Sequence, residues 1–189
     1  MKWFSTYLYQ RTSIILALIA TGLMVLYASR ILGSESNIIT SELQDGDKLL
    51  GLKLGYGIDY VSHLFSYLSQ IALKQYSSLL IKWDNLFPFV YGSMYLLWLS
   101  LIYKNITFKK PVLKLINLYP LIPLIADLIE NYFERLLITN YLDKGIIQES
   151  TVMVASGITT MKWGLSTLNY IIIVIGIILL IKTKIKAKT

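Results

Sequence analysis

Long apolar stretches alternate with polar ones along the chain, and this pattern predicts the fold. Each stretch runs for about twenty residues, which is enough for an α-helix to cross the hydrocarbon core of a bilayer. We therefore predict four membrane-spanning helices, at residues 13–32, 84–103, 112–133 and 163–181. Four successive spans favour an all-α membrane protein, an antiparallel four-helix transmembrane bundle forming a single domain over residues 1–189. A cleaved signal peptide is the alternative for the first stretch, although Leu26-Tyr27-Ala28 is a poor cleavage site.

The polar segment between the first two spans, residues 33–83, is predicted to contain an amphipathic helix. Apolar residues recur in it at steps of three and four, the spacing of one helical face. This stripe covers residues 59–80 and consists of Val61, Leu64, Phe65, Leu68, Ile71, Ala72 and Leu79. Too many polar residues accompany the stripe for a membrane span, so we expect the helix to lie on the membrane surface or over the mouth of the bundle.

Prolines lie within the second and third spans. Pro120 and Pro123 lie three residues apart in the third span, where we expect a kink or a locally unwound turn. Pro88 falls in the first turn of the second span, where its missing N–H would be unpaired in any case. Asp84 or Asn85 is placed to cap that helix.

Charge is distributed unevenly about the predicted spans. One side holds basic residues with no acid among them: Lys2, Arg11, Lys104, Lys109, Lys110, Lys114, Lys182, Lys184, Lys186 and Lys188. All eleven acids lie on the other side or in the far half of the third span. By the positive-inside rule, we predict a multi-pass membrane protein with both termini cytoplasmic. The polar loops 33–83 and 134–162 are then extracytoplasmic.

Composition narrows the classes of protein to consider. The chain is 55% hydrophobic and 15% charged, and its mean hydropathy of +0.58 lies outside the range of ordinary soluble domains. It contains no Cys, which excludes disulfides, thiolate metal sites and Cys nucleophiles, and a single His argues against a His-rich metal centre. We therefore expect no metal and no cofactor. The net charge of +7 indicates topology rather than binding of nucleic acid.

The far end of the third span carries the most unusual residues. An ionisable side chain within a membrane span costs roughly 2.5–3.5 kcal/mol at the helix centre, so it marks a functional site by default. Asp127, Glu130, Asn131 and Glu134 are spaced by three, four and seven residues, which places them on one helical face. Such a face is expected to look into the bundle rather than at lipid.

Every other span offers polar partners near the same end. These are Arg30 on the first span, Asp84, Asn85 and Tyr91 on the second, and Lys162 and Asn169 on the fourth. Lys162 is the preferred counter-ion for Glu130 or Asp127, with Arg30 and Arg135 as alternatives. Two interpretations remain open: a polar clasp that fixes helix register, or a site that binds or transforms a ligand.

His63 is the only imidazole in the chain and falls on the predicted amphipathic helix. It is a weaker candidate for contact with a ligand or for proton transfer, because a lone His is more often an ordinary, partly exposed residue. The sequence contains no phosphate loop, nucleophile elbow, zinc motif or dinucleotide fingerprint.

Several of these residues also occur in a recognisable order. The runs are Gly55–Val61, Leu64-Phe65, Tyr76, Asp84–Gly92, Ala126–Asn131 and Lys162. In this the chain resembles an uncharacterised family of four-span bacterial integral membrane proteins with an Ala-Asp-x-x-Glu-Asn signature in the third span. The resemblance implies the same topology and points to Asp84, Asp127, Glu130, Asn131 and Lys162. It also implies a location in the bacterial cytoplasmic (inner) membrane, but it implies no mechanism. Relatives often have a Gly-Arg pair before the Tyr, and this chain has Ala72-Leu73-Lys74-Gln75 there, so a role that needs this Arg is not carried over unless Lys74 substitutes for it.

The leading functional hypothesis is an inner-membrane protein that binds a lipid, a small amphiphile or a partner membrane subunit at its extracytoplasmic mouth. A homo-oligomer is the other possible partnership. The alternative is a membrane-embedded enzyme acting on a lipid-linked substrate, with Asp127 or Glu130 as acid or base and Lys162 steadying charge. An ion pathway is less favoured because the inner halves of the spans hold no ionisable residue.

Overall fold

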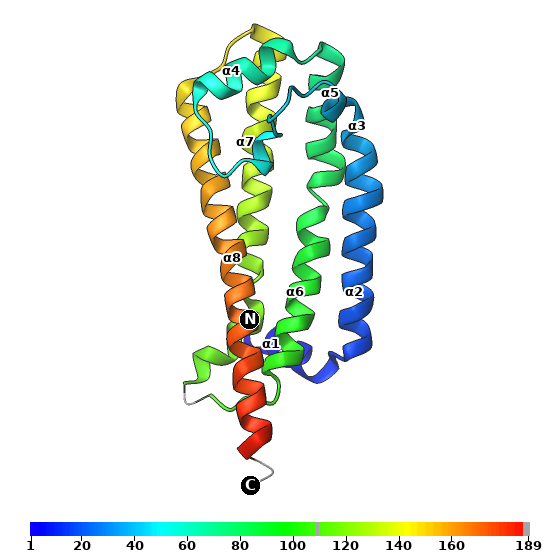
Figure 1. Ribbon diagram of the computed structural model, residues 1–189. Coiled ribbons are helices and arrows are strands. Elements are labelled where there is room, and N and C mark those ends of the chain that lie inside the picture. Colours follow the sequence, from blue (N-terminus) through cyan, green and yellow to red (C-terminus); the bar gives the residue numbers. More distant parts are fainter. Residues whose placement is uncertain (109, 187–189) are drawn as a thin grey trace.

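The computed structural model describes residues 1–108 and 110–186, and among these the side chains of residues 184 and 186 are not described. The described residues form helices joined by turns and loops, with no strand among them (Figure 1). The all-α prediction is thus confirmed. Three helices are long and apolar enough to cross a membrane, or four if one bent pair counts as a span.

The first candidate span is longer than predicted. After the short helix α1 (Lys2–Arg11), helix α2 (Ile14–Leu26) continues through a π-helical turn into α3 (Gly33–Ser41). The whole segment is helical for 28 residues. Ser13 caps its start, because the Ser13 side chain accepts a hydrogen bond from the Leu16 N–H. The loop expected to begin at residue 33 begins instead after Ser41.

The predicted amphipathic helix is two helices. Helix α4 (Ile58–Tyr67) ends where Leu68 and Ser69 adopt extended backbone, and α5 (Gln70–Leu79) follows. The Ser69 N–H and hydroxyl both donate to the Glu42 carboxylate at 2.7 Å, which holds the chain in this break. These two hydrogen bonds lower the pKa of Glu42, and the one from the Ser69 backbone N–H has the larger effect. Their stabilisation is therefore present at neutral pH and is lost as the pH falls through that lowered pKa.

Helix α5 belongs to the second candidate span rather than to a surface helix. A π-helical turn, Leu80–Asp84, joins α5 to α6 (Phe87–Tyr103), so that Gln70–Tyr103 forms one segment of 34 residues. Pro88 lies in the first turn of α6, as predicted. Asp84 and Asn85 do not cap α6, because the helical backbone runs on through the π turn. The Tyr27 hydroxyl donates to the Trp83 carbonyl in this turn at 2.7 Å.

The third and fourth candidate spans also extend past their predicted ends. A 3₁₀ helix, Pro111–Leu118, meets α7 (Leu121–Lys144) at an angle of 42°, where Pro120 and Pro123 had predicted a kink. Helix α7 ends at Gly145, which is left-handed at φ 66°. Helix α8 then runs without a break over Glu149–Lys186. Most of the polar segment 134–162 is therefore helix and not loop.

Helices α2, α6, α7 and α8 lie side by side along the long axis of the molecule (Figure 1). Helix α4 crosses one end, and the N-terminus lies toward the other with α1 and the end of α8. Helix α6 is central. In the apolar part of its span 44% of the residues are buried, compared with 6% for the span that contains α2 and 11% for α8. The exposed apolar faces of α2 and α8 suit contact with lipid tails.

The largest apolar core lies at the α4 end. The loop before α4, helices α4 and α5, and the adjoining ends of α3, α7 and α8 bury residues such as Leu50, Phe65, Leu73, Tyr76 and Leu137. This core fastens the loop against the helices. The loop is thereby held directly over the polar residues of α7.

Candidate functional site

The polar face of α7 is buried inside the helix assembly. Glu130 has no exposed surface, Glu134 is 1% exposed, and Asp127 and Asn131 are also buried. Their spacing along the helix brings them to one side, as the sequence predicted, and that side faces α6 and α8. Carboxyl groups buried to this extent require polar partners.

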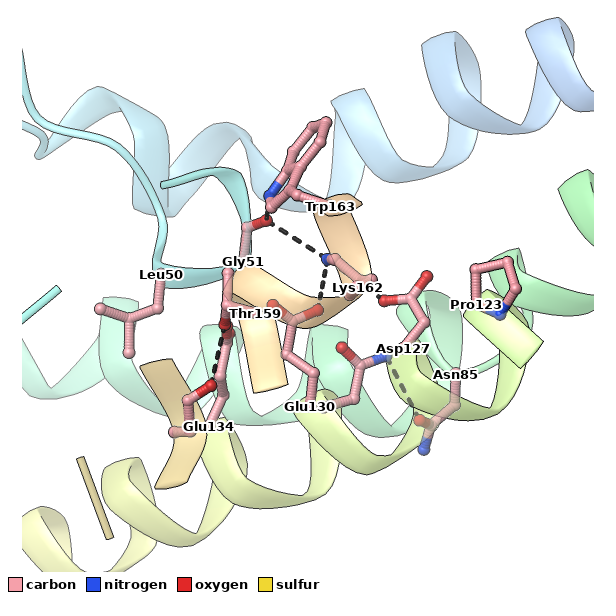
Figure 2. Close-up of polar contacts among 12 residues, drawn as sticks. Leu50, Gly51, Asn85, Pro123, Asp127, Glu130, Glu134, Thr159, Lys162 and Trp163 are labelled. Carbon is pink, nitrogen blue, oxygen red and sulfur yellow. Dashed lines mark hydrogen bonds and ion pairs between the residues drawn. The ribbon is translucent and has the colours of Figure 1, made fainter. Parts of the chain in front are cut away.

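Lys162 of α8 is the principal partner (Figure 2). Its ammonium group forms an ion pair with Glu130 and lies 3.3 Å from the Asp127 carboxylate. The Lys162 side chain is only 13% exposed, so this pairing takes place largely out of water. Lys162 was predicted from the sequence as the counter-ion of Glu130 or Asp127, and it contacts both.

The loop before α4 closes over this ion-pair cluster. The Gly51 carbonyl accepts hydrogen bonds from the Lys162 ammonium and from the Trp163 indole, both at 3.3 Å. A Cβ at position 51 would lie 3.2 Å from the Glu134 Oε1, so a side chain there would crowd the carboxylate. Backbone carbonyls leave no signal in a sequence, and sequence reasoning missed Gly51 for that reason.

Tyr76 links the loop, α5 and α7. Its buried hydroxyl accepts a hydrogen bond from the Leu50 N–H at 3.0 Å and donates one to the Glu134 Oε2 at 2.9 Å. The other carboxyl oxygen of Glu134, Oε1, is buried without a hydrogen-bond partner among the described residues. Tyr76 was absent from the predicted site, although it falls within the motif that carries the family resemblance.

The second span contributes Asn85 and Asp84. The Asn131 side-chain amide donates to the Asn85 side-chain oxygen at 3.4 Å, which joins α7 to the start of α6 (Figure 2). Asp84 lies nearby and, within the described part of the chain, forms neither an ion pair nor a side-chain hydrogen bond. It lines an open space between the helices.

That space is a partly open cavity of about 470 Å³. Its charged end is lined by Asp84, Asp127, Glu134 and Lys162. Its remaining walls are largely apolar and come from the α2–α3 segment, the loop, α5, α6 and α8, including Met24, Ala28, Leu32, Leu79, Leu80, Phe87 and Met94. Helices α2 and α8 both line the cavity, yet over their described residues they make no extended contact with each other.

Aromatic side chains form a connected row along one wall of the cavity. The ring centroids of Phe87 and Tyr91 are 5.3 Å apart, those of Tyr91 and Tyr95 6.2 Å, and those of Tyr95 and Tyr170 5.8 Å. All four residues, together with Trp163, line the cavity. The Tyr91 hydroxyl donates to the Pro123 carbonyl at 3.3 Å and so rests on the kinked start of α7.

Three predicted site residues lie apart from this cluster. Arg30 is exposed on the π-helical turn after α2 and does not line the cavity. His63 is half exposed on α4, with its Nε2 3.6 Å from an Asp47 carboxylate oxygen. Asn169 is fully buried but outside the cavity lining, and its side-chain amide has no partner among the described residues.

Asp47 also accepts a hydrogen bond from the Tyr67 hydroxyl at 2.6 Å, and burial together with this bond raises the pKa of Tyr67 to about 12. His63 and Asp47 thus belong to a surface contact that steadies α4. Nowhere in the described chain are three or more acidic or His side chains grouped so that they could hold a metal ion.

Compared with known proteins, the chain matches no family model, no curated protein and no solved structure.

Proposed function

We propose that this protein is a four-span bundle of a bacterial inner membrane that binds a lipid or small amphiphile in the cavity between α2 and α8. In this proposal α2, α6, α7 and α8 alternate in direction across the bilayer. Helix α4 and the loop before it are extracytoplasmic, and both termini are cytoplasmic. The ligand's head group occupies the charged end of the cavity, and its tail lies along the apolar walls.

The observation that carries the proposal is a cavity with one charged end and largely apolar walls. Its volume falls within the range of about 300–1,000 Å³ that is usual for small-molecule sites. A ligand that matches both parts must itself be amphiphilic. Because α2 and α8 line the cavity without packing together, such a ligand can enter sideways from the bilayer.

Depth within the membrane supports the same assignment. Lys162 and Lys182 lie on the continuous helix α8, about twenty residues or roughly 30 Å apart, which is the thickness of the hydrocarbon core. With Lys182 at the cytoplasmic interface, Lys162 comes to the opposite interface, at the level of lipid head groups. From Lys162 to Tyr170 the cavity extends about 12 Å along α8 into the hydrocarbon.

The proposal is tested by filling the cavity. Ala28 lines the cavity, whereas the neighbouring Ser29 is exposed and does not. We expect native mass spectrometry of the gently extracted protein to detect a bound amphiphile that Ala28→Trp removes and Ser29→Trp retains. Equal retention by the two variants, or a bound partner subunit with no amphiphile, would contradict the proposal.

The enzymatic alternative has less support from the geometry. A general acid or base must come within hydrogen-bond reach of the proton that it transfers. Asp127 lines the cavity and meets this condition, but Glu130 is fully buried, paired with Lys162, and not among the residues that line the cavity. We therefore rank binding ahead of acid–base chemistry.

A further inference from the structure

We propose that the head group recognised at the charged end of the cavity is a primary ammonium group, so that the ligand is an amphiphilic amine. This inference rests on the proposed function and specifies its ligand class. The two sources of such a ligand are an aminophospholipid, whose ethanolamine carries the ammonium group, and a free long-chain amine.

The first argument is the balance of charge around the cavity. Three acidic residues, Asp84, Asp127 and Glu134, line it, against one basic residue, Lys162. The Lys162 ammonium is already engaged with Glu130, Asp127 and the Gly51 carbonyl. An anionic head group would therefore meet uncompensated carboxylates, whereas a cationic one would complete the pairing.

The second argument is the supply of hydrogen-bond acceptors. The Glu134 Oε1 is buried and unpartnered among the described residues. The Asp84 side chain also lines the cavity, and Asp84 is a partly buried residue. Buried acceptors without donors are costly, so a ligand that brings donors binds favourably. A primary ammonium group brings three N–H donors and no acceptor, which is the complement of these free oxygens.

The third argument is the aromatic wall. Phe87, Tyr91 and Trp163 line the cavity together with the acids. A cation over an aromatic face is attracted by the ring quadrupole, and the attraction increases when water is excluded. Neither an alcohol nor a carboxylate head group gains this interaction. Charge, hydrogen bonding and aromatic contact therefore favour the same head group.

The experiment compares three amphiphiles that differ only in head group. Dodecylamine is protonated at pH 7, dodecanol is neutral and dodecanoate is anionic. Each is titrated below its micellar concentration into the protein in dodecyl maltoside, with protein-free micelles as the blank, and binding is measured by calorimetry. We expect dodecylamine to bind at least about tenfold more tightly than the other two, the order of one charge-assisted hydrogen bond.

Variants test which residue is responsible for the preference for dodecylamine. Asp84→Asn is expected to abolish the tenfold preference, whereas Asp143→Asn, at an exposed acid near the end of α7, keeps it. Glu134→Gln is a second test should Asp84→Asn fail to fold. Equal or tighter binding of dodecanol or dodecanoate overturns the inference. If that binding is still blocked by Ala28→Trp, the proposed function survives. If none of the three binds, both proposals fail.

The two sources are distinguished in nanodiscs that contain phosphatidylethanolamine and phosphatidylglycerol in equal amounts. Selective retention of phosphatidylethanolamine in native mass spectra supports an aminophospholipid ligand. Retention of neither lipid, together with tight binding of dodecylamine, supports a free amine. Selective retention of phosphatidylglycerol contradicts the inference.

Discussion

At the scale of single residues, the cluster around Lys162 depends on one cation balancing several buried acids. Lys162 contacts Glu130, Asp127 and the Gly51 carbonyl, and these groups come from α7 and from the loop over it. A buried ion pair adds little net stability compared with apolar packing, but loss of one partner leaves an uncompensated charge. The cluster is therefore sensitive to removal of Lys162 whether it acts as a clasp or as a binding site.

Replacement of Lys162 by Met measures this sensitivity. We expect Lys162→Met to destabilise the protein by about 3–5 kcal/mol, because Glu130 and Asp127 lose their counter-ion. Thermal unfolding in detergent, followed by circular dichroism, is the measurement. Lys144→Met, at an exposed lysine, is the control and should change little. The double variant Lys162→Met, Glu130→Gln should recover part of the loss. A Lys162→Met protein as stable as the control would show that the cluster has no clasp role.

At the scale of elements, close contacts between helices determine the positions of the helices that line the cavity. Helix α8 packs on α6 at Gly176, where an added Cβ would lie 2.6 Å from Ile102 and 2.7 Å from Tyr103. The Tyr103 hydroxyl also donates to the Ile172 carbonyl at 2.8 Å. On the other side, the Trp98 indole donates to the Thr21 hydroxyl at 2.9 Å and fixes α2 against α6. Helix α6 thus packs against both α2 and α8.

A bulky residue at position 176 is expected to separate α8 from α6. Gly176→Leu should lower stability by roughly 1–3 kcal/mol, the usual cost of overpacking, and should weaken amphiphile binding because the α8 wall shifts. Gly164→Leu, on the same helix with nothing within 4 Å of its added Cβ, is the matched control. Unfolding midpoint and ligand titration report the two effects. Equal behaviour of the two variants would argue against the packing of α8 on α6.

At the scale of the whole molecule, the two ends differ in charge and in structure. The end that holds α4 carries the loop, the apolar core and the buried acids, and the opposite end carries α1 and basic residues such as Lys104, Lys110 and Lys182. Our proposed orientation follows the positive-inside rule, by which the basic end is cytoplasmic. The proposed cavity then faces the outer leaflet.

Topology reporters test this orientation. Alkaline phosphatase is active only outside the cytoplasm, so we expect it to be inactive when fused after Lys188 and active when fused after Gly145, between α7 and α8. A green fluorescent protein at the same positions should give the reverse pattern. Phosphatase activity after Lys188 would overturn the orientation and with it the assignment of the cavity to the outer leaflet.

The sequence by itself determined the class of protein, the apolar spans and the polar face of α7. These follow from local properties. The free energy of transferring apolar residues into a bilayer is summed along a segment, and helical spacing alone places Asp127, Glu130 and Glu134 on one face. The kink at Pro120 and Pro123 is equally local, since it follows from a missing N–H and a steric clash.

Only the tertiary structure decided the lengths of the helices and the composition of the site. The helices run past their apolar segments because the polar ends α3 and α5 pack against each other and α5 also packs against α7. The contact of Gly51 with Lys162 joins residues 111 apart in sequence through a backbone carbonyl, which every residue possesses. The cavity is likewise enclosed by residues from several helices that lie far apart in the sequence. No local pattern encodes such a space, because it depends on how distant side chains fill the volume between helices.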